Sequence, residues 1–277
     1  PAKTSAVVKA DAYGLGMARV APALAQAGCD TFFVALPEEG RALRALLPAA
    51  DIYVFVGVLS DAEAELMAAH RLMPVLNDRG QIDRFAAFAR GRSQRLPCAI
   101  HIDTGMNRLG VGAGELKALI DDPSPLAALE TRLVLSHLAC GNEVDAALNE
   151  RQRAAFAADA GKVAPGARLS LANSGGIFLG ANFHFDLVRP GAAIMGLAPL
   201  VGRPNPMRTT VHLTAPIIQV RHVDSPGSVG YGATHRIGAK AKIATVSVGY
   251  ADGYAFSLGN RGHAFLGSIR LPVVGRV

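Results

Sequence analysis

The sequence has no tryptophan and only three cysteines among its 277 residues. Cys29, Cys98 and Cys140 lie far apart, with neither a Cys-x-x-Cys pair nor the spacing of metal ligands. This scarcity excludes a disulfide framework and a cysteine-based metal centre. Isolated thiols of this kind are typical of a cytoplasmic protein, and that is the location we expect.

Long hydrophobic runs and long basic runs are also missing. No apolar stretch reaches the roughly 18 residues that cross a bilayer, so we expect no membrane span. The net charge is +6, but the basic residues are spread along the chain without aromatic interleaving. This distribution argues against a nucleic-acid partner and fits a site for a small anionic ligand.

The two ends of the sequence suggest a fragment of a longer chain. The first residue is Pro1 rather than methionine, and the last stretch, LPVVGRV, resembles an unfinished strand. A signal peptide ahead of this segment stays open for the same reason.

Apolar runs alternate with alanine-rich helical patterns over the first 200 residues. The expected strands are 6–8, 31–35, 52–56, 73–76, 98–102, 132–136, 168–172 and 187–188. The expected helices are 17–27, 38–46, 61–70, 81–89, 114–120 and 146–160, with 175–179 as a weaker candidate before the last strand. Eight such units predict an α/β fold, a (β/α)8 TIM barrel, with an open doubly wound sheet as the alternative.

Polar residues follow several of these strands. They are Lys9, the segment Asp103 to Gly105 with Arg108, His137, the segment Asn173 to Gly176, and Arg189. In a barrel the carboxyl ends of all strands meet at one face, where such enzymes place their active sites. The sequence therefore predicts one site that combines a lysine, arginines, a histidine and small polar groups.

The pattern changes after about residue 205. Stretches rich in Val, Ile and Thr are separated by glycine-containing turns, and no long helical pattern intervenes. We expect a TIM-barrel domain over residues 1–205 and the start of a mostly β-strand domain over residues 206–277.

The stretch AVVKADAYGLG, residues 6–16, places Lys9 at the end of an apolar run. A lysine in this position usually buries its stem and keeps its ammonium group in water. Partial desolvation would instead lower the lysine pKa and make the amine a Schiff-base nucleophile. Local sequence alone leaves both interpretations open.

The same stretch closely resembles the pyridoxal-phosphate attachment signature of the alanine racemases. Five further blocks resemble that family in its order: DTGMNRLG (103–110), LANSGG (171–176), LVRPGAAIMG (187–196), VGYGATH (229–235) and VGYADG (248–253). The resemblance covers essentially the whole chain. It implies a fold-type III enzyme with pyridoxal 5'-phosphate as its cofactor.

The resemblance also implies the catalytic pair. Lys9 would bind the cofactor as a Schiff base and exchange the α-proton on the face used for the D-enantiomer, while Tyr231 would act on the opposite face. A tyrosine with the usual pKa near 10 is a poor base at neutral pH, so it needs a tuning neighbour. His137 matches the family histidine that could supply this effect.

Further matches imply the cofactor and substrate contacts. Arg189 would contact the pyridine nitrogen, and because a guanidinium only donates, the ring would stay unprotonated. Phosphate contacts are implied for Tyr13, Ser174, Gly191 and Ala192, with Asn173 beside them. Arg108 would bind the substrate carboxylate, together with Tyr231 and Tyr250 near the entrance.

Two more features follow from the family. Its second base comes from the partner subunit, so a homodimer with shared sites is implied. The family often has a carbamylated lysine seven residues before the arginine that binds substrate, and here that position is His101. Histidine forms no stable carbamate, which puts the orientation of Arg108 in question.

The resulting hypothesis is an alanine racemase, an isomerase that supplies D-alanine for peptidoglycan of the cell wall. One alternative is a serine or broad-specificity racemase on the same scaffold, or a basic amino-acid decarboxylase, although Arg189 argues against the decarboxylase. The other is a non-catalytic pyridoxal-phosphate-binding barrel, against which the second domain with Tyr231 argues.

Overall fold

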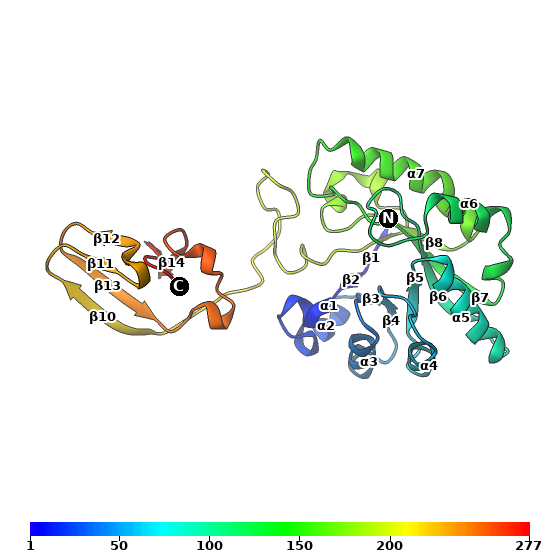
Figure 1. Ribbon diagram of the computed structural model, residues 1–277, viewed down its shortest axis with the longest axis horizontal. Helices are drawn as coiled ribbons and strands as arrows, with labels where there is room; N and C mark the ends of the chain where they lie inside the picture. Colours follow the sequence, from blue (N-terminus) through cyan, green and yellow to red (C-terminus); the bar gives the residue numbers. More distant parts are fainter. The chain divides into compact units, whose positions relative to one another are not determined.

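A computed structural model describes residues 1–277, and the chain divides into two compact units, Pro1–Val211 and His212–Val277. Figure 1 shows parallel strands with surrounding helices in the first unit, and antiparallel ribbons in the second. No helix is both long and apolar enough to cross a membrane.

The first unit is built on a curved parallel sheet whose strands follow chain order from β2 to β8. Its strands are β2 (Ala6–Val7), β3 (Thr31–Val34), β4 (Asp51–Val54), β5 (Met73–Leu76), β6 (Leu96–His101), β7 (Leu129–Leu135) and β8 (Arg168–Ser170). Each strand pairs with the next in parallel, for example Phe32 of β3 opposite Ile52 of β4.

Backbone hydrogen bonds close this sheet into a barrel. Strand β1 (Lys3–Thr4) directly precedes β2 and pairs in parallel with β9 (Leu187–Val188). Next to β9, Arg189 N donates to Ala172 O over 2.9 Å, just beyond the end of β8. The predicted (β/α)8 barrel is therefore confirmed, and the open doubly wound alternative is wrong.

Helices connect the strands and cover the outside of the barrel (Figure 1). They are α2 (Met17–Gln26), α3 (Pro37–Leu46), α4 (Asp61–Ala69), α5 (Arg79–Gly91), α6 (Ala113–Asp121) and α7 (Ala147–Val163), with 3-10 turns η1 (Ser124–Leu126), η2 (Gly176–Leu179) and η3 (Ala181–Phe183). Their starts follow local chemistry: the Asp78 carboxylate caps α5 by accepting from Gln81 N. The last connection has only the turns η2 and η3 because its residues show little helical periodicity.

Alternate strand residues face the inside of the barrel and the helices outside it. Phe33 packs in the interior with Val7, Met73 and Leu133, while its neighbour Phe32 packs in the outer core. The Phe33 ring stacks on Tyr53 at 4.9 Å and on Phe55 at 5.2 Å between centroids. This aromatic stack fills the barrel beneath the carboxyl ends of the strands.

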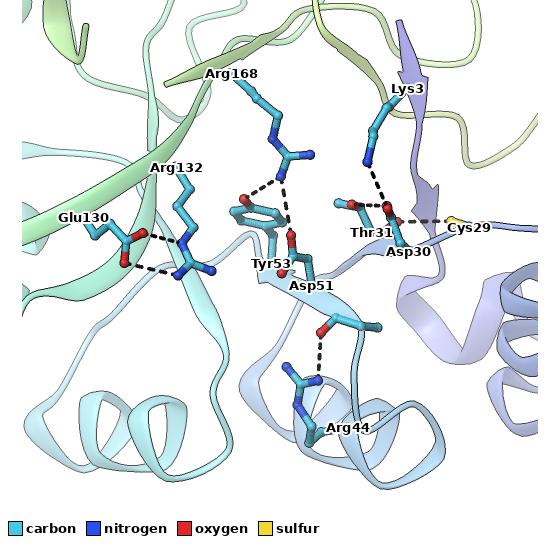
Figure 2. Close-up of polar contacts among 11 residues, drawn as sticks. Lys3, Cys29, Asp30, Thr31, Arg44, Asp51, Tyr53, Glu130, Arg132 and Arg168 are labelled. Carbon is cyan, nitrogen blue, oxygen red and sulfur yellow. Dashed lines mark hydrogen bonds and ion pairs between the residues drawn. The ribbon is translucent and has the colours of Figure 1, made fainter. Parts of the chain in front are cut away.

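Charged residues occupy the amino end of the strands (Figure 2). Arg168 lies 3.5 Å from Asp51 and donates to the Tyr53 hydroxyl over 3.4 Å, and Lys3 pairs with Asp30 at 3.1 Å. Burial raises the pKa of Tyr53 to about 12, so its hydroxyl stays protonated. These groups are paired with one another and stabilise this end of the barrel rather than presenting free reactive groups.

The second unit consists of antiparallel two-stranded ribbons. Strands β10 (Ile217–Val223) and β13 (Ala241–Val246) form one ribbon, and the others are β11 (Gly227–Val229) with β12 (His235–Ile237) and β14 (His263–Leu266) with β15 (Ile269–Pro272). Short 3-10 turns lie between them: η4 (Tyr231–Ala233), η5 (Tyr250–Asp252) and η6 (Phe256–Leu258). Its predicted mostly β-strand character is confirmed.

Candidate active site

A cavity of about 330 Å³ opens at the carboxyl end of the barrel strands. It is lined by residues that follow β2, β4, β7, β8 and β9. All eight residues expected to bind the cofactor line it: Lys9, Tyr13, His137, Asn173, Ser174, Arg189, Gly191 and Ala192. The lining includes no aspartate or glutamate, so the site favours an anionic ligand.

Lys9 leads into a left-handed turn, α1 (Lys9–Tyr13). Ala10, Asp11, Ala12 and Tyr13 have φ values of 53°, 51°, 55° and 58°. Two backbone hydrogen bonds of 2.9 Å, from Ala12 N to Val8 O and from Gly14 N to Ala10 O, close the turn. Left-handed backbone costs L-residues other than glycine roughly 1–2 kcal/mol each, and such strain is concentrated at functional sites.

The turn corrects the prediction for the first strand. We expected a strand over 6–8 that ends at Lys9, but β2 ends at Val7 and Lys9 begins the turn. Gly14 and Gly16 have φ of 83° and 89°, as a sharp change of direction requires. The chain therefore starts its turn on four non-glycine residues, before either glycine.

Lys9 is half-buried and offers a free amine to the cavity. Its Nζ lies 6.0 Å from the centroid of the Phe55 ring and makes no ion pair with another side chain. Contact with an aromatic face holds the ammonium group without tying it to a carboxylate. No carboxylate therefore competes with a ligand for the Lys9 side chain.

Tyr13, Ser174 and the loop after β9 form a cluster of donors. The Ser174 hydroxyl accepts from Gly191 N over 3.0 Å and from Ala193 N over 3.1 Å, which leaves its own proton free to donate. A Cβ on Gly191 would lie 2.0 Å from the Tyr13 hydroxyl, so a side chain here would displace the Tyr13 ring. Burial raises the pKa of Tyr13, so this hydroxyl is a donor at neutral pH. Such a cluster suits a phosphate group.

Arg189 is buried, with 2% of its surface exposed. Its Nη1 donates to Ser170 Oγ and its Nη2 to Ser136 O, both over 2.5 Å, but its Nε is buried without a partner. Burial lowers the pKa of Arg189 to about 9, which still leaves the guanidinium charged at neutral pH. A buried donor without a partner is rare, and a neutral ring nitrogen in the cavity would satisfy it.

His137 lies between two donor nitrogens, of which a neutral imidazole can accept from only one. Arg189 Nη2 is 3.5 Å from its Nδ1, and Asn173 Nδ2 is 3.4 Å from its Nε2. Burial, followed by the charge of Arg189, lowers the pKa of His137 to about 3. The ring is therefore neutral and polar at the pH of the cell, next to the guanidinium.

His101 lies beneath the cavity in a buried hydrogen-bond network. Its Nδ1 is 2.8 Å from Asn77 Oδ1, while Asn77 Nδ2 donates to Phe55 O and Val75 O, both over 2.9 Å. These two bonds fix the Asn77 oxygen toward the ring, so His101 carries its proton on Nδ1 and is neutral. Burial, followed by the charge of Arg189, lowers its pKa to about 4.

The remaining predicted residues lie outside the cavity lining. Arg108 is exposed on a loop whose backbone is held by the Asp103 carboxylate, which accepts from Gly105 N, Met106 N and Asn107 N. Tyr231 and Tyr250 belong to the second unit, where they are 85% and 72% exposed. Exposure of this degree leaves both phenols available to a ligand or another chain.

Some lining residues were missed by sequence reasoning. They are Val7, Phe55, Ala139, Gly141, Asn142, Ala198 and Pro199. Gly141 is packed closely, since a Cβ there would lie 2.5 Å from Asn173 Oδ1. A glycine at this position was the available signal, whereas nothing local marks Phe55, which comes just after β4.

Other surfaces offer less chemistry. A larger hollow of about 540 Å³ lies over α4 and α5, lined by Asp61, Gly80, Arg84, Ala87 and Phe88. It contains no lysine, serine, cysteine or histidine that could act as a nucleophile or base. The cavity at the barrel mouth is therefore the candidate active site.

Family models match both parts of the chain. Residues 1–199 match the model described as alanine racemase, N-terminal domain, and residues 210–277 match alanine racemase, C-terminal domain.

Relatives match over the entire chain. The alanine racemase of Rhodospirillum rubrum is 52% identical over 277 residues, covering 100% of this chain and 74% of that protein. The alanine racemase of Rhizobium meliloti is 44% identical, covering 100% of this chain and 75% of that protein.

Solved structures agree. The alanine racemase of Bartonella henselae, whose crystal structure has covalently bound pyridoxal phosphate, is 40% identical with a TM-score of 0.90, covering 100% of this chain and 77% of that one. The biosynthetic alanine racemase of Pseudomonas aeruginosa has a TM-score of 0.90 at 33% identity, covering 100% of this chain and 76% of that one.

Proposed function

Because the chain belongs to the alanine racemase family, we propose that it is a pyridoxal-phosphate-dependent isomerase that interconverts L-alanine and D-alanine. The observation that carries this proposal is the cavity in which a free lysine, a donor cluster and the unpartnered Nε of Arg189 come together. The lysine would form a covalent bond to the cofactor, the donor cluster would bind its phosphate, and the Arg189 Nε would donate to its pyridine nitrogen.

The residues present fit the cofactor. Lys9 would hold it covalently, and Arg189 Nε would donate to its ring nitrogen. The Tyr13 and Ser174 hydroxyls with the N–H groups of Gly191 and Ala192 would bind its phosphate, Gly191 N exchanging its bond to Ser174 Oγ for one to the phosphate. When bound, pyridoxal phosphate supplies the electron sink that makes the α-proton of an amino acid acidic.

Racemisation needs proton transfer on both faces of the α-carbon. We assign Lys9 Nζ to the face that exchanges the proton of D-alanine, and Tyr231 Oη to the opposite face. Lys9 is suited to this role because its amine is held over Phe55 at 6.0 Å without a carboxylate partner. Tyr231 is suited because its side chain is 85% exposed and can reach a site formed with another chain.

Arg189 limits the chemistry that the site can support. A guanidinium cannot take up a proton or give its own to a ring nitrogen at neutral pH, in contrast to a carboxylate at the same place. The neutral His137 beside it adds no charge. This arrangement favours short-lived loss and return of one proton over decarboxylation.

Substrate binding and assembly complete the proposal. Arg108 would bind the substrate carboxylate through its planar guanidinium, with Tyr250 near the entrance. A homodimer would bring Tyr231 of one chain to Lys9 of the other. Within each chain, the first domain would span residues 1–205 and the second domain residues 206–277. We place the enzyme in the cytoplasm, in line with its three free cysteines, where D-alanine would enter peptidoglycan synthesis.

The test is spectroscopic and chemical. Purified protein supplied with pyridoxal phosphate should show a yellow absorption band that Lys9→Ala abolishes, and it should racemise alanine faster than serine or lysine in a chiral assay. A colourless wild-type protein would refute the cofactor assignment. A preference for serine or lysine would refute the substrate assignment alone.

A further inference from the structure

The carboxylate of Glu39 connects two segments that are 29 residues apart. Glu39 is the third residue of α3, and its Oε2 accepts from Ala35 N over 2.7 Å and from Leu36 N over 3.1 Å, at the start of that helix. Its Oε1 accepts from Ala10 N over 2.6 Å. One side chain therefore binds both the β3–α3 junction and the left-handed turn after Lys9.

The contact with Ala10 has no substitute within the turn. The turn's own hydrogen bonds are donated by Ala12 N and Gly14 N, whereas Ala10 N pairs with Glu39 alone. This N–H belongs to the peptide that joins Lys9 to Ala10, so its orientation sets the direction in which Lys9 leaves the backbone. Ala10 is also the first residue of the turn with positive φ, at 53°.

Helix capping by itself does not explain this geometry. Glu63 is the third residue of α4 and caps that helix in the same way, accepting from Leu59 N over 2.7 Å. Its contacts stay within its own helix start. Glu39 differs because its second carboxylate oxygen accepts from Ala10 N, in the left-handed turn.

We propose that Glu39 is a positioning residue that holds the left-handed turn, and with it Lys9 and Tyr13, in the geometry that binds the cofactor. This inference rests on the proposed function because it takes Lys9 and Tyr13 as the groups that hold pyridoxal phosphate. Strained backbone persists only where surrounding contacts determine it. Met17 N, at the start of α2, binds the middle of the turn by donating to Asp11 Oδ1 over 2.6 Å, whereas Glu39 binds its first peptide from a distant part of the chain. Released from it, residues 10–13 would relax toward right-handed or extended backbone and swing both side chains away.

Glu39→Gln separates the two roles of this side chain. Glutamine is isosteric and still caps a helix through its remaining oxygen. Its amide nitrogen can only donate, so it cannot accept from Ala10 N and faces it instead as a second donor. Glu63→Gln is the matched control because it alters a helix cap in the same way without touching the turn.

The readout is amide hydrogen exchange of the peptide spanning residues 8–16 in the holoenzyme, together with the release rate of pyridoxal phosphate. We expect both to rise by about tenfold or more in Glu39→Gln, the effect of losing one charge-assisted hydrogen bond, and to stay at wild-type values in Glu63→Gln. Melting temperatures of the two variants should agree within a few degrees.

A glycine rescue distinguishes strain from general damage. Ala10 is exposed, so Ala10→Gly removes no packing but lets this position adopt positive φ without cost. In the Glu39→Gln background it should slow cofactor release again. Equal exchange and release in Glu39→Gln and Glu63→Gln would overturn the proposal, as would faster exchange throughout the barrel without a local change. Both of these outcomes are independent of the Lys9→Ala experiment, in which loss or retention of the cofactor tests the proposed function.

Discussion

The buried histidine beneath the cavity predicts a measurable dependence of stability on pH. His101 has its pKa lowered to about 4 by burial, followed by the charge of Arg189, with Arg108 acting in the same direction and Asp103 against it. In the unfolded chain its pKa is about 6.5. Between these values the unfolded state binds the proton and the folded state does not, so the free energy of unfolding falls as pH falls below about 6.5 and levels off below about 4.

The size of the effect follows from the two pKa values. At about pH 5 an unfolded histidine is almost fully protonated while His101 in the fold is mostly neutral, which costs about 2 kcal/mol of stability relative to about pH 7.5. His101→Gln removes the titration but keeps an amide N–H for Asn77 Oδ1. Between about pH 7.5 and about pH 5, the free energy of unfolding of the variant should therefore fall by about 2 kcal/mol less than that of the wild type.

Urea unfolding of the holoenzyme at both pH values measures this difference. Protonation of His137 lowers the stability of both proteins equally, so its contribution cancels in the comparison. The exposed His263→Gln is the control, and its profile should follow that of the wild type. Identical losses in His101→Gln and wild type would show that His101 takes up a proton in the fold, and would refute the neutral state assigned to it.

Three other changes test individual contacts. Gly191→Ala places a Cβ 2.0 Å from the Tyr13 hydroxyl, so the ring must move and pyridoxal phosphate should dissociate at least about tenfold faster, as measured by absorbance after dilution. Because the pKa of Tyr53 is raised to about 12, the fold loses stability as pH rises above about 10, and Tyr53→Phe should reduce that loss in unfolding curves. Asp78→Ala removes the cap of α5 and should cost about 1 kcal/mol by thermal unfolding, with cofactor binding unchanged.

Much of the barrel could be predicted because its local signals agree. Strands such as 73–76 and 187–188 match the structure to the residue, and helix bounds differ by at most three residues. Most strands contain short apolar runs that are buried, and helices such as α4 and α5 begin at capping residues, Ser60 and Asp78. The weak candidate at 175–179 became a 3-10 turn because three glycines lie within or beside it.

The left-handed turn could not be predicted in the same way. Ala10, Asp11 and Ala12 prefer right-handed backbone, so their local preference is opposite to the structure. The stabilising contact comes from Glu39, which has no local relation to the turn. Nor does any pattern around Phe55 indicate that its ring lies under Lys9, because that contact depends on the order β2-β3-β4 of the strands in the sheet.

The site could be predicted in part. The strand-end pattern and the family resemblance together identified eight residues that the fold brings into one cavity. The roles of Arg108, Tyr231 and Tyr250 stay predictions, since none of them lines that cavity.

Exchange of the α-proton of alanine with deuterated water tests the central claim most directly. The wild-type holoenzyme should exchange the proton of both L-alanine and D-alanine as it interconverts them. Tyr231→Phe should slow exchange from L-alanine far more than from D-alanine, because Lys9 still serves the other face. Equal rates from the two enantiomers in this variant would contradict the assignment of Lys9 and Tyr231 to opposite faces.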